Sequence, residues 1–450
     1  MNDSTYAYSV VDPATGRLSG VADEALPEPV TVAEAGLNVG DPVPEHLRVH
    51  HGNWLAWPHR RWAFTHMDEL RASARIAVCG PIGDPFPDAH PPRVGGGEGA
   101  ARKPGPVGLE ALDGLVVDDG SGGTWELHEM LHRTYADALL VVRRGEVMAE
   151  WYGDGMDRWT RHVMFSMTKT VTGVLALLAV HDGAMGLDDL LVDHVSELAD
   201  SAYAPVTVRQ ALDMTDGIRF DEDYASSHSD INRYGIAMSF TPVPAGWDGP
   251  VGVHEGILAL THRVLPPGEA FAYKSVTTDV LAWATARATG QRWADGVSDR
   301  IWTPMGAEVD ASVMLDERGI AVSSGGMSCT LRDVARFVRM LGRSGRVGSG
   351  SEERQAIPAP VADDVAIGGD PAGDIADLYP TRAGWTYHRQ CWNARHVLGG
   401  LVQMGIGGQR AFCHPEEDLV VATFGSHPVA GNVLTDPIFT SLVRRLLERL

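Results

Sequence analysis

One short stretch constrains the fold more than any other. The sequence MFSMTK, residues 164–169, runs without a break into the apolar segment Thr170 to Val180. Helical positions three apart share a face, so we expect the Ser166 hydroxyl and the Lys169 amino group to be neighbours at the start of a buried helix. Burial and the positive end of the helix macrodipole disfavour a charged lysine, so Lys169 could act as a base toward Ser166. The alternative is an N-cap serine followed one turn later by a solvated lysine.

Length and composition are those of a globular protein. A chain of 450 residues can bury a large core and is expected to form two closely packed lobes. Its net charge of -22 would repel the phosphates of a nucleic acid. The first 25 residues hold no apolar signal-peptide core, and the run Val171 to Val180 is far shorter than the ~20 residues that span a bilayer. We therefore expect a cytoplasmic protein with no nucleic-acid and no membrane partner.

Cysteine and histidine spacing predicts no metal and no other cofactor. The four cysteines have no Cys-x-x-Cys pair and are expected to be reduced core thiols; they are Cys79, Cys329, Cys391 and Cys413. In a loop-like arm, His50, His51 and His59 have no His-x-x-x-His partner on a helix.

The chain divides into an arm, a sheet domain and a helical insert. Residues 1–108 predict an N-terminal arm and linker, in which the aromatic and basic stretch Asn53 to Phe64 could be a binding platform. We expect instead that its tryptophans pack the arm onto the body and its arginines pair with acids. Residues 109–184 and 380–450 predict an α/β sheet domain, and 185–379 predict an inserted helical domain. Residues 80–108 and 343–377 are rich in Gly and Pro and predict irregular segments.

Strands at both ends of the chain around a helical insert predict an α/β (α+β) fold, with a sheet assembled from the N- and C-terminal segments and a helical lobe between them. We expect strands in a hairpin over 138–152, turning at Arg144-Gly145, and at 397–404, 409–413 and 419–424. Helices are expected at 127–136, from the serine motif to 182–183, and at 206–214, 276–289, 331–341 and 438–450.

Two further segments could complete a site around Ser166. The first, Tyr273-Lys274-Ser275, precedes a predicted helix. The Tyr273 phenol would lie near two amino groups, which would lower its pKa and let it shuttle a proton. Ser275 would hydrogen-bond Lys169 or the substrate. In Gly405-Ile406-Gly407-Gly408-Gln409, glycines such as Gly408 let the backbone approach a substrate, and the Gln409 and Ser166 amides could form an oxyanion hole. The alternatives are a Tyr-x-Ser loop packed on a helix start and a plain β-turn.

The order Ser-x-x-Lys, Tyr-x-Ser, Gly-Gly-Gln resembles that of the serine β-lactamase and penicillin-binding-protein superfamily. Over residues 50–450 the chain is most similar to the nylon-oligomer (6-aminohexanoate-dimer) hydrolases and class C β-lactamase-like esterases. The similar segments are Asn53-Trp54, 58–64, 165–169, 212–214, Asp221-Glu222-Asp223-Tyr224, 273–275, 278–283, 325–330 and 405–409.

The resemblance implies a β-lactamase-like fold, an antiparallel sheet flanked by helices with an inserted helical lobe. It also implies roles for particular residues. Ser166 would be the nucleophile, Lys169 its base and Tyr273 the shared acid and base, while Tyr224 would donate to the scissile amide nitrogen. It also implies a homodimer. Two positions depart from the family pattern. Gly235, with Asp230 nearby, replaces an acid that holds a substrate ammonium, and Ser324, which the resemblance implies to be at the substrate-binding site, replaces an asparagine.

A third departure concerns β-lactams. In β-lactamases and penicillin-binding proteins, a cation compensates the substrate carboxylate at the position that Ile406 occupies here. The loss of that charged hydrogen bond would cost about 1.5 to 3 kcal/mol of binding free energy. We therefore expect neutral substrates to be preferred over penicillins. Trp247, Trp385 and Trp392 could wall the cleft or pack in the core.

The sequence thus predicts a serine hydrolase working through an acyl-enzyme on Ser166. Small carboxylic esters are the first expected substrates and small linear amides the second. An acyltransferase would use the same residues with a different acceptor. A covalent ligand sensor or inactive binding protein would keep Ser166 but not turn over.

Overall fold

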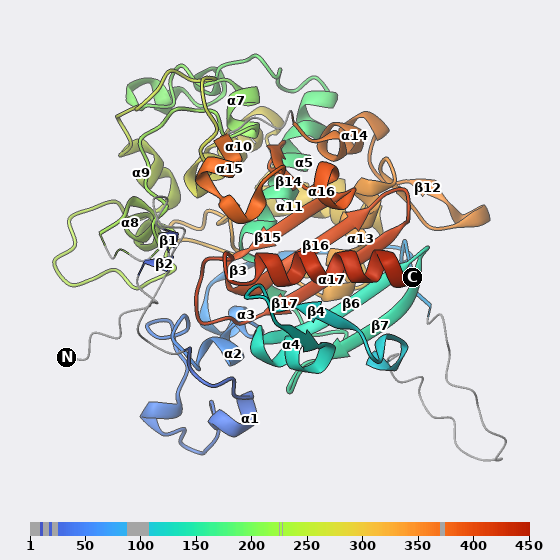
Figure 1. Cartoon of the computed structure of the whole chain (residues 1–450). Helices are drawn as coiled ribbons and strands as arrows, with labels where there is room; N and C mark the ends of the chain where they lie inside the picture. Colours follow the sequence, from blue (N-terminus) through green and yellow to red (C-terminus); the bar gives the residue numbers. More distant parts are fainter. Residues whose placement is uncertain are drawn as a thin grey trace.

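A seven-stranded antiparallel sheet lies at the centre of the molecule (Figure 1). The computed structural model describes residues 10–11, 18–19, 26–87, 108–224, 226, 228–369 and 374–450. The sheet has the order β13-β14-β15-β16-β17-β6-β7, so it joins early and late segments of the chain. Its strands are β6 (Ala136–Arg143), β7 (Glu146–Tyr152), β13 (Thr386–His388), β14 (Cys391–Asn393), β15 (Leu401–Gly405), β16 (Gln409–His414) and β17 (Leu419–Gly425).

Strand β6 is apolar on both faces because each face packs against helices. Leu139 and Val141 belong to the hydrophobic cluster that contains residues of α4 (Leu127–Arg133) and α17 (Asp436–Arg449). The alternate residues Leu140 and Val142 belong to the cluster of α5 (Thr168–His181) and α13 (Leu331–Gly342). Figure 1 shows α17 crossing one face of the sheet, with α5 and α13 on the other side. The result is a helix–sheet–helix sandwich, the fold class that the sequence predicted.

The predicted hairpin between β6 and β7 is confirmed. Arg144 and Gly145 both have positive φ, 53° and 83°, which matches a two-residue primed turn between twisted strands. The turn sets the register that pairs Arg143 with Glu146.

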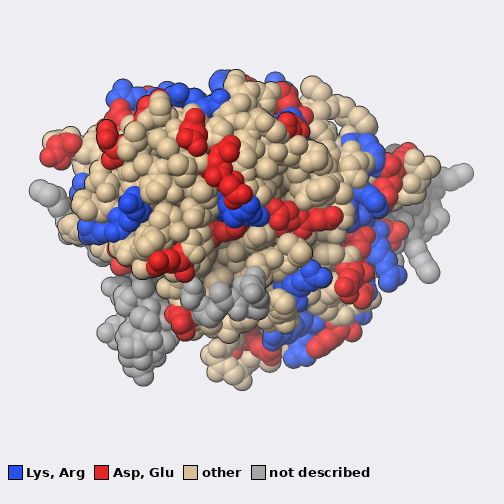
Figure 2. Space-filling model, turned by 90° about the horizontal axis from the view of Figure 1, so that it is seen from above, with Lys and Arg blue, Asp and Glu red and all other residues tan. Residues whose placement is uncertain are grey.

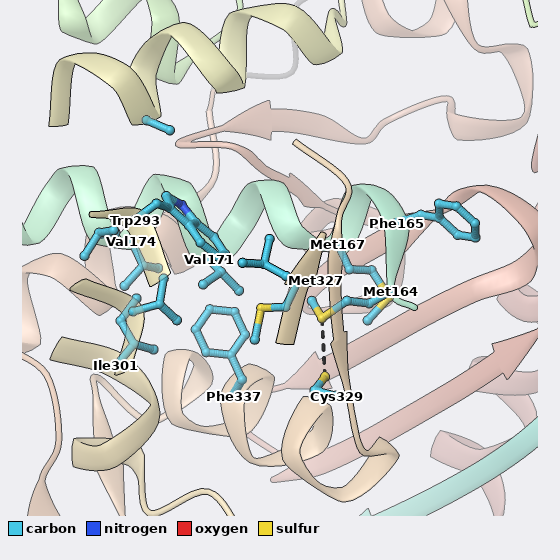
Figure 3. Packing of buried hydrophobic residues seen from close by; sticks show 14 of the residues in the cluster. Met164, Phe165, Met167, Val171, Val174, Trp293, Ile301, Met327, Cys329 and Phe337 are labelled. Carbon is cyan, nitrogen blue, oxygen red and sulfur yellow. Dashed lines mark hydrogen bonds between the residues drawn. The ribbon is translucent and has the colours of Figure 1, made fainter. Parts of the chain in front are cut away.

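A smaller four-stranded sheet positions the start of α5. Its order is β3-β9-β10-β8, formed by β3 (Ser73–Ile76), β9 (Ala311–Met314), β10 (Met327–Cys329) and β8 (His162–Val163). Strand β8 leads directly into the short 3₁₀ turn η3 (Phe165–Met167) and then α5. Figure 3 shows Val171 and Val174 of α5 packed among Trp293, Ile301 and Phe337. Nearly all of α5 is buried, as its uninterrupted apolar sequence predicted.

The remaining helices lie mostly above the sheet in the view of Figure 1. They include α6 (Leu191–His194), α7 (Val208–Leu212), α8 (Asp230–Ala237), α9 (Val253–Leu258), α10 (Ser275–Thr289), α11 (Trp293–Val297), α12 (Thr303–Met305), α14 (Ala359–Ile367), α15 (Asp374–Leu378) and α16 (Arg395–Leu398). Around the arm are α1 (Val32–Ala35), α2 (Arg60–Ala63) and α3 (Met67–Leu70). Short two-stranded pairs complete the described elements: β1 (Val10–Val11) with β2 (Leu18–Ser19), β4 (Val116–Asp118) with β5 (Thr124–Glu126), and β11 (Arg346–Val347) with β12 (Arg354–Gln355).

Three sequence predictions are wrong at element boundaries. Helix α4 ends at Arg133 because Ala136 already pairs in the sheet. The strand predicted over 397–404 begins only at Leu401, since α16 precedes it and ends at Gly399 in the left-handed conformation. The irregular segment 343–377 contains α14, whose Val361, Ala362 and Val365 are buried at helical spacing.

The tryptophan-rich stretch packs the arm onto the body, as predicted. Trp54 is 1% exposed, and its indole N–H donates to the Phe240 carbonyl at 2.7 Å. Arg61 pairs with Asp137, whereas Arg60 donates to the backbone carbonyls of Leu55 and His427. The domain boundaries at 108, 184 and 379 remain predictions.

On the face seen in Figure 2, acidic and basic side chains are interspersed and no continuous basic surface forms. Among the residues that the structure describes, no helix is long and apolar enough to cross a membrane. All four cysteines are free; three are buried, but Cys79 is exposed, contrary to the prediction of a core thiol.

Candidate active site

The turn that carries Ser166 is strained and clamped by aromatic rings. Phe165 has a φ of +44°, an uncommon conformation for a bulky residue. Its ring stacks on Trp54 at 6.2 Å between centroids and meets Phe64 edge-on at 4.9 Å. The arm therefore holds the turn in which Ser166 precedes α5, and Ser166 lies in this turn rather than in the helix proper.

Lys169 lies beside Ser166, as the three-residue spacing predicted. Its Nζ donates to Ser166 Oγ at 2.9 Å and to the Ser324 carbonyl at 2.8 Å. Lys169 is 1% exposed, and no carboxylate of a described residue lies within ion-pair distance of it. Burial lowers the pKa of Lys169 to about 8, with Glu222 and Asp279 opposing the shift. The neutral amine is therefore a minor species at pH 7, but far more abundant than for an exposed lysine.

Tyr273 reaches the same serine, but the predicted fall in its pKa is wrong. Its hydroxyl hydrogen-bonds Ser166, and Lys169 Nζ lies 5.0 Å from its ring centroid. Burial and the nearby Glu222 raise the pKa of Tyr273. The second amino group is not at the phenol, because Lys274 pairs with the buried Asp216 at 2.9 Å. Tyr273 therefore stays protonated and suits the role of an acid.

Glu222 organises one side of the site. Its carboxylate accepts from the Ser275 backbone N–H, and from the Tyr224 hydroxyl at 3.2 Å. The Ser275 hydroxyl hydrogen-bonds Glu222 too, so Ser275 supports this carboxylate instead of binding Lys169. Burial raises the pKa of Glu222, and burial raises that of Tyr224. Tyr224 lines the pocket, where the resemblance located it.

The glycine-rich turn brings Ile406, and not Gln409, to the pocket. Gly405 and Ile406 line the cavity beside Ser166, whereas Gly408 and Gln409 do not. Gln409 is fully buried, and its side chain ties the turn together through Gly425 O at 2.6 Å and Ile406 O at 3.1 Å. Gly408 and Gln409 therefore lie outside the cavity lining, with strand β16 beginning at Gln409, and the oxyanion role of the Gln409 amide stays a prediction.

Ser324 binds Lys169 through its backbone carbonyl, and its hydroxyl does not contact Lys169 but Asp279. The Ser324 hydroxyl donates to Asp279 at 2.7 Å, and Ser323 and Tyr234 donate to the same carboxylate. Burial raises the pKa of Asp279. Ser324 does not line the pocket, so the prediction that it contacts substrate is not supported.

Ser166 opens into a cavity of about 410 Å³, a size suited to a small organic substrate. Of the three candidate tryptophans only Trp392 lines it. Gly235 and Asp230 do not, and Asp230 instead accepts from the Asp221 backbone N–H at 3.0 Å. The lining residues are Ser166, Asp221, Glu222, Asp223, Tyr224, Ala272, Tyr273, Leu378, Tyr379, Pro380, Thr381, Arg382, Trp392, Met404, Gly405, Ile406, Ala430, Gly431, Asn432, Val433 and Asp436.

Sequence reasoning missed the charged groups of this cavity. Glu222 lies in the segment 221–224 that carries the resemblance, but the resemblance implies a role only for Tyr224. Arg382 ends the short 3₁₀ helix η7 (Pro380–Arg382), Asp436 lies in the first turn of α17, and no short motif marks either residue. Only the fold brings them to Ser166.

A pattern typical of zinc proteases also occurs in the chain. Residues His128 to His132 match His-Glu-x-x-His on α4. Glu129 there pairs with Arg133, and no group of three metal-ligating side chains forms among the described residues. The match therefore does not form a metal centre in this part of the chain.

Comparison with known proteins agrees with the geometry. The family model described as Beta-lactamase matches residues 128–433. The chain is 30% identical over 385 residues to the 6-aminohexanoate-dimer hydrolase of Paenarthrobacter ureafaciens, covering 84% of this chain and 88% of that protein. A proposed 6-aminohexanoate-dimer hydrolase from Bacillus anthracis superposes with a TM-score of 0.74 at 25% identity, over 90% and 99% of the two chains. The fold is shared by a family VIII carboxylesterase, with a TM-score of 0.51 at 16% identity over 70% and 92%.

Proposed function

The chain belongs to the beta-lactamase family, and on that premise we propose that it is a serine hydrolase of small carboxylic esters and linear amides. One observation carries the proposal: Ser166 Oγ accepts a hydrogen bond from a buried lysine that has no carboxylate partner among the described residues. A serine needs a neutral base beside it to become a nucleophile, and the lowered pKa of Lys169 supplies one.

The reaction would run through an acyl-enzyme. Ser166 Oγ attacks the carbonyl carbon and its proton passes to Lys169 Nζ. The backbone N–H groups of Ser166 and Ile406 would hold the oxyanion, since both residues line the cavity and Gln409 does not.

Leaving-group departure requires an acid, which the protonated Tyr273 provides. The C–O or C–N bond breaks as Tyr273 gives its proton to the leaving atom, and the Lys169 ammonium then reprotonates the phenolate. In the second half water attacks the acyl carbon and gives a proton to Lys169 Nζ. The bond between the acyl carbon and Ser166 Oγ then breaks, Lys169 returns the proton to Ser166 Oγ, and the carboxylic acid leaves. Tyr224 would donate to the scissile nitrogen of an amide.

The test compares the protein with Ser166→Ala on p-nitrophenyl acetate, p-nitrophenyl butyrate, nitrocefin and a linear aminohexanoate dimer. We expect ester turnover by the unmodified protein and a loss of more than about 10³-fold in kcat/KM in the variant. Nitrocefin should be a poor substrate because Ile406 supplies no charge for its carboxylate.

Other outcomes would change the assignment. Equal ester hydrolysis by both proteins would refute it. Labelling of Ser166 by a fluorophosphonate without turnover of any substrate would indicate a covalent sensor instead. Dimer cleavage faster than ester cleavage would make the protein primarily an amidase.

A further inference from the structure

A buried carboxylate lies behind the catalytic base and has no role in the chemistry proposed above. It belongs to Asp279 on α10, which is 2% exposed. Three hydroxyl groups donate to it. That of Ser323 donates to Oδ1 at 2.7 Å, and those of Ser324 and Tyr234 donate to Oδ2 at 2.7 and 2.9 Å. Burying a carboxylate is costly unless donors replace its water, so the carboxylate and these hydroxyls fix one another.

Ser323 and Ser324 form a turn between α5 and α10, two helices that pack against each other. Both serine hydroxyls donate to Asp279 on α10, whereas both serine carbonyls accept from α5. The Ser323 carbonyl accepts from Thr172 Oγ1 at 2.8 Å, and the Ser324 carbonyl accepts from Lys169 Nζ at 2.8 Å. Thr172 and Lys169 are three residues apart and share a face of α5. The turn is therefore held on both sides, and on the side of α10 it is Asp279 that holds it.

The Ser324 carbonyl determines where the Lys169 amine lies. Lys169 Nζ has two acceptors among the described residues, Ser166 Oγ at 2.9 Å and this carbonyl. A lysine amine on its flexible four-carbon stem has no fixed position of its own, so its hydrogen-bond partners place it. A displacement of about 1 Å between reacting groups can cost about 10²-fold in rate. Proton transfer from Ser166 therefore depends on what fixes the Ser324 carbonyl.

We propose that Asp279 is a positioning residue for the catalytic base, an inference that rests on the hydrolase function proposed above. Asp279 fixes the Ser324 hydroxyl, and the carbonyl of the same residue holds Lys169 Nζ at hydrogen-bond distance from the nucleophile. Asp279 does not line the catalytic cavity, so its effect on the reaction passes through Ser324.

The charge of Asp279 gives the proposal a readout that a packing role would not move. Burial lowers the pKa of Lys169, and the Asp279 carboxylate opposes this shift by favouring the ammonium. Removing the charge should therefore move the pH at which Lys169 becomes a base. A residue that only stabilised the fold would change the amount of folded protein and leave this pH in place.

The first experiment compares two serine variants in p-nitrophenyl butyrate hydrolysis. Ser324→Ala and Ser323→Ala each remove one hydroxyl that donates to Asp279 at 2.7 Å, but only the Ser324 carbonyl binds Lys169. We expect kcat to fall about tenfold in Ser324→Ala, the cost of one hydrogen bond, with KM little changed. Ser323→Ala is the matched control and should lose less than about threefold, because the Ser323 carbonyl faces Thr172.

The second experiment changes the carboxylate itself. Asp279→Asn keeps the shape but removes the charge and one acceptor oxygen, and we expect kcat to fall about tenfold. The acidic limb of kcat/KM should move to lower pH by less than about one unit. Adding Ser324→Ala to Asp279→Asn should cost less than about twofold more, because both changes act on the same hydrogen bond. Asp113→Asn, at an exposed acid outside the cavity, should alter neither kcat nor the limb.

Each outcome decides the inference. Unchanged kcat in folded Ser324→Ala overturns it, as do equal losses in the two serine variants. Additive losses in the double variant, or a loss in Asp279→Asn without movement of the acidic limb, also overturn it. The serine pair leaves Asp279 in place, so a folding defect in Asp279→Asn leaves the inference testable. If Ser166→Ala keeps its esterase activity, the proposed function fails; if activity needs Ser166 but the serine variants behave alike, only the positioning role fails.

Discussion

The structure describes two lysines, which are equally buried but lie in opposite electrostatic surroundings. The chain has 34 arginines and only three lysines, of which Lys103 lies outside the described residues. Lys169 is 1% exposed and donates to a hydroxyl and a carbonyl, whereas Lys274 is 2% exposed and pairs with Asp216 at 2.9 Å. Asp216 also accepts from Thr277 and from the Ile218 backbone N–H.

The difference shows how one residue type serves two purposes. A buried amine with only neutral acceptors is easily deprotonated and becomes a base. A buried amine facing a fully hydrogen-bonded carboxylate is held as a cation and fixes the loop before α10. Arginine could replace the second lysine in charge, but it could not serve as the base, because it does not lose its proton. The comparison predicts that the two lysines respond oppositely to the same substitution.

The largest expected effect is on catalysis. Lys169→Met removes the base, and we expect kcat/KM for p-nitrophenyl butyrate to fall by about 10³-fold or more. Lys274→Met should reduce kcat/KM of the folded protein far less, because Lys274 Nζ donates to Asp216 and to the Ala272 carbonyl and not to Ser166. Equal losses of kcat/KM in the two variants, measured on protein shown to be folded by circular dichroism, would contradict the different roles of the two lysines.

Stability should change in the reverse order. Lys274→Met leaves Asp216 buried without its partner, and we expect the free energy of unfolding to fall by about 3 to 5 kcal/mol. Lys169→Met removes an amine that is costly to charge, and we expect a gain of about 1 to 2 kcal/mol at pH 7. Urea unfolding of both variants measures the two changes. The double variant Lys274→Met, Asp216→Leu removes the orphaned carboxylate and should recover part of the loss.

The pH dependence of the free energy of unfolding tests whether Lys169 has the lowered pKa of a buried amine. The pKa of Lys169 is lowered from 10.5 in the unfolded chain to about 8 in the folded protein, so the unfolded chain binds more protons between these values. The free energy of unfolding should therefore gain a rising contribution across that window, which Lys169→Met should lack. A contribution that persists in the variant would show that another group causes it.

Local sequence was sufficient to predict that Ser166 and Lys169 are neighbours. Ser166 and Lys169 are three residues apart on one segment, so helical geometry alone brings them together, and an uninterrupted apolar run predicts burial. The same holds for the hairpin at Arg144-Gly145, where the turn residues fix the local pairing. These features depend on neighbours in sequence.

Features that depend on distant segments could not be predicted in this way. The pKa of Tyr273 depends on Glu222, from a loop 51 residues earlier, and on Lys274 facing Asp216 rather than the phenol. Whether Ile406 or Gln409 faces the cavity depends on where β16 begins to pair. Arg382 and Asp436 meet only because α17 packs against the loop before β13. Spacing in the sequence carries no signal for such contacts.

The smallest expected effect concerns Glu222, the acid that raises the pKa of Lys169. The unmodified enzyme should show kcat/KM rising with pH up to about 8, because only neutral Lys169 is a base. Glu222 favours the charged lysine and raises the pKa of Lys169, so Glu222→Gln should move this limb to lower pH, by less than about one unit. The amide oxygen still accepts from the Ser275 N–H, which keeps the loop in its position. Glu352→Gln, an exposed acid outside the cavity, should leave the limb unchanged. A shift to higher pH in Glu222→Gln would mean that Glu222 does not act on Lys169 through its charge, and that the neutral surroundings alone set the base.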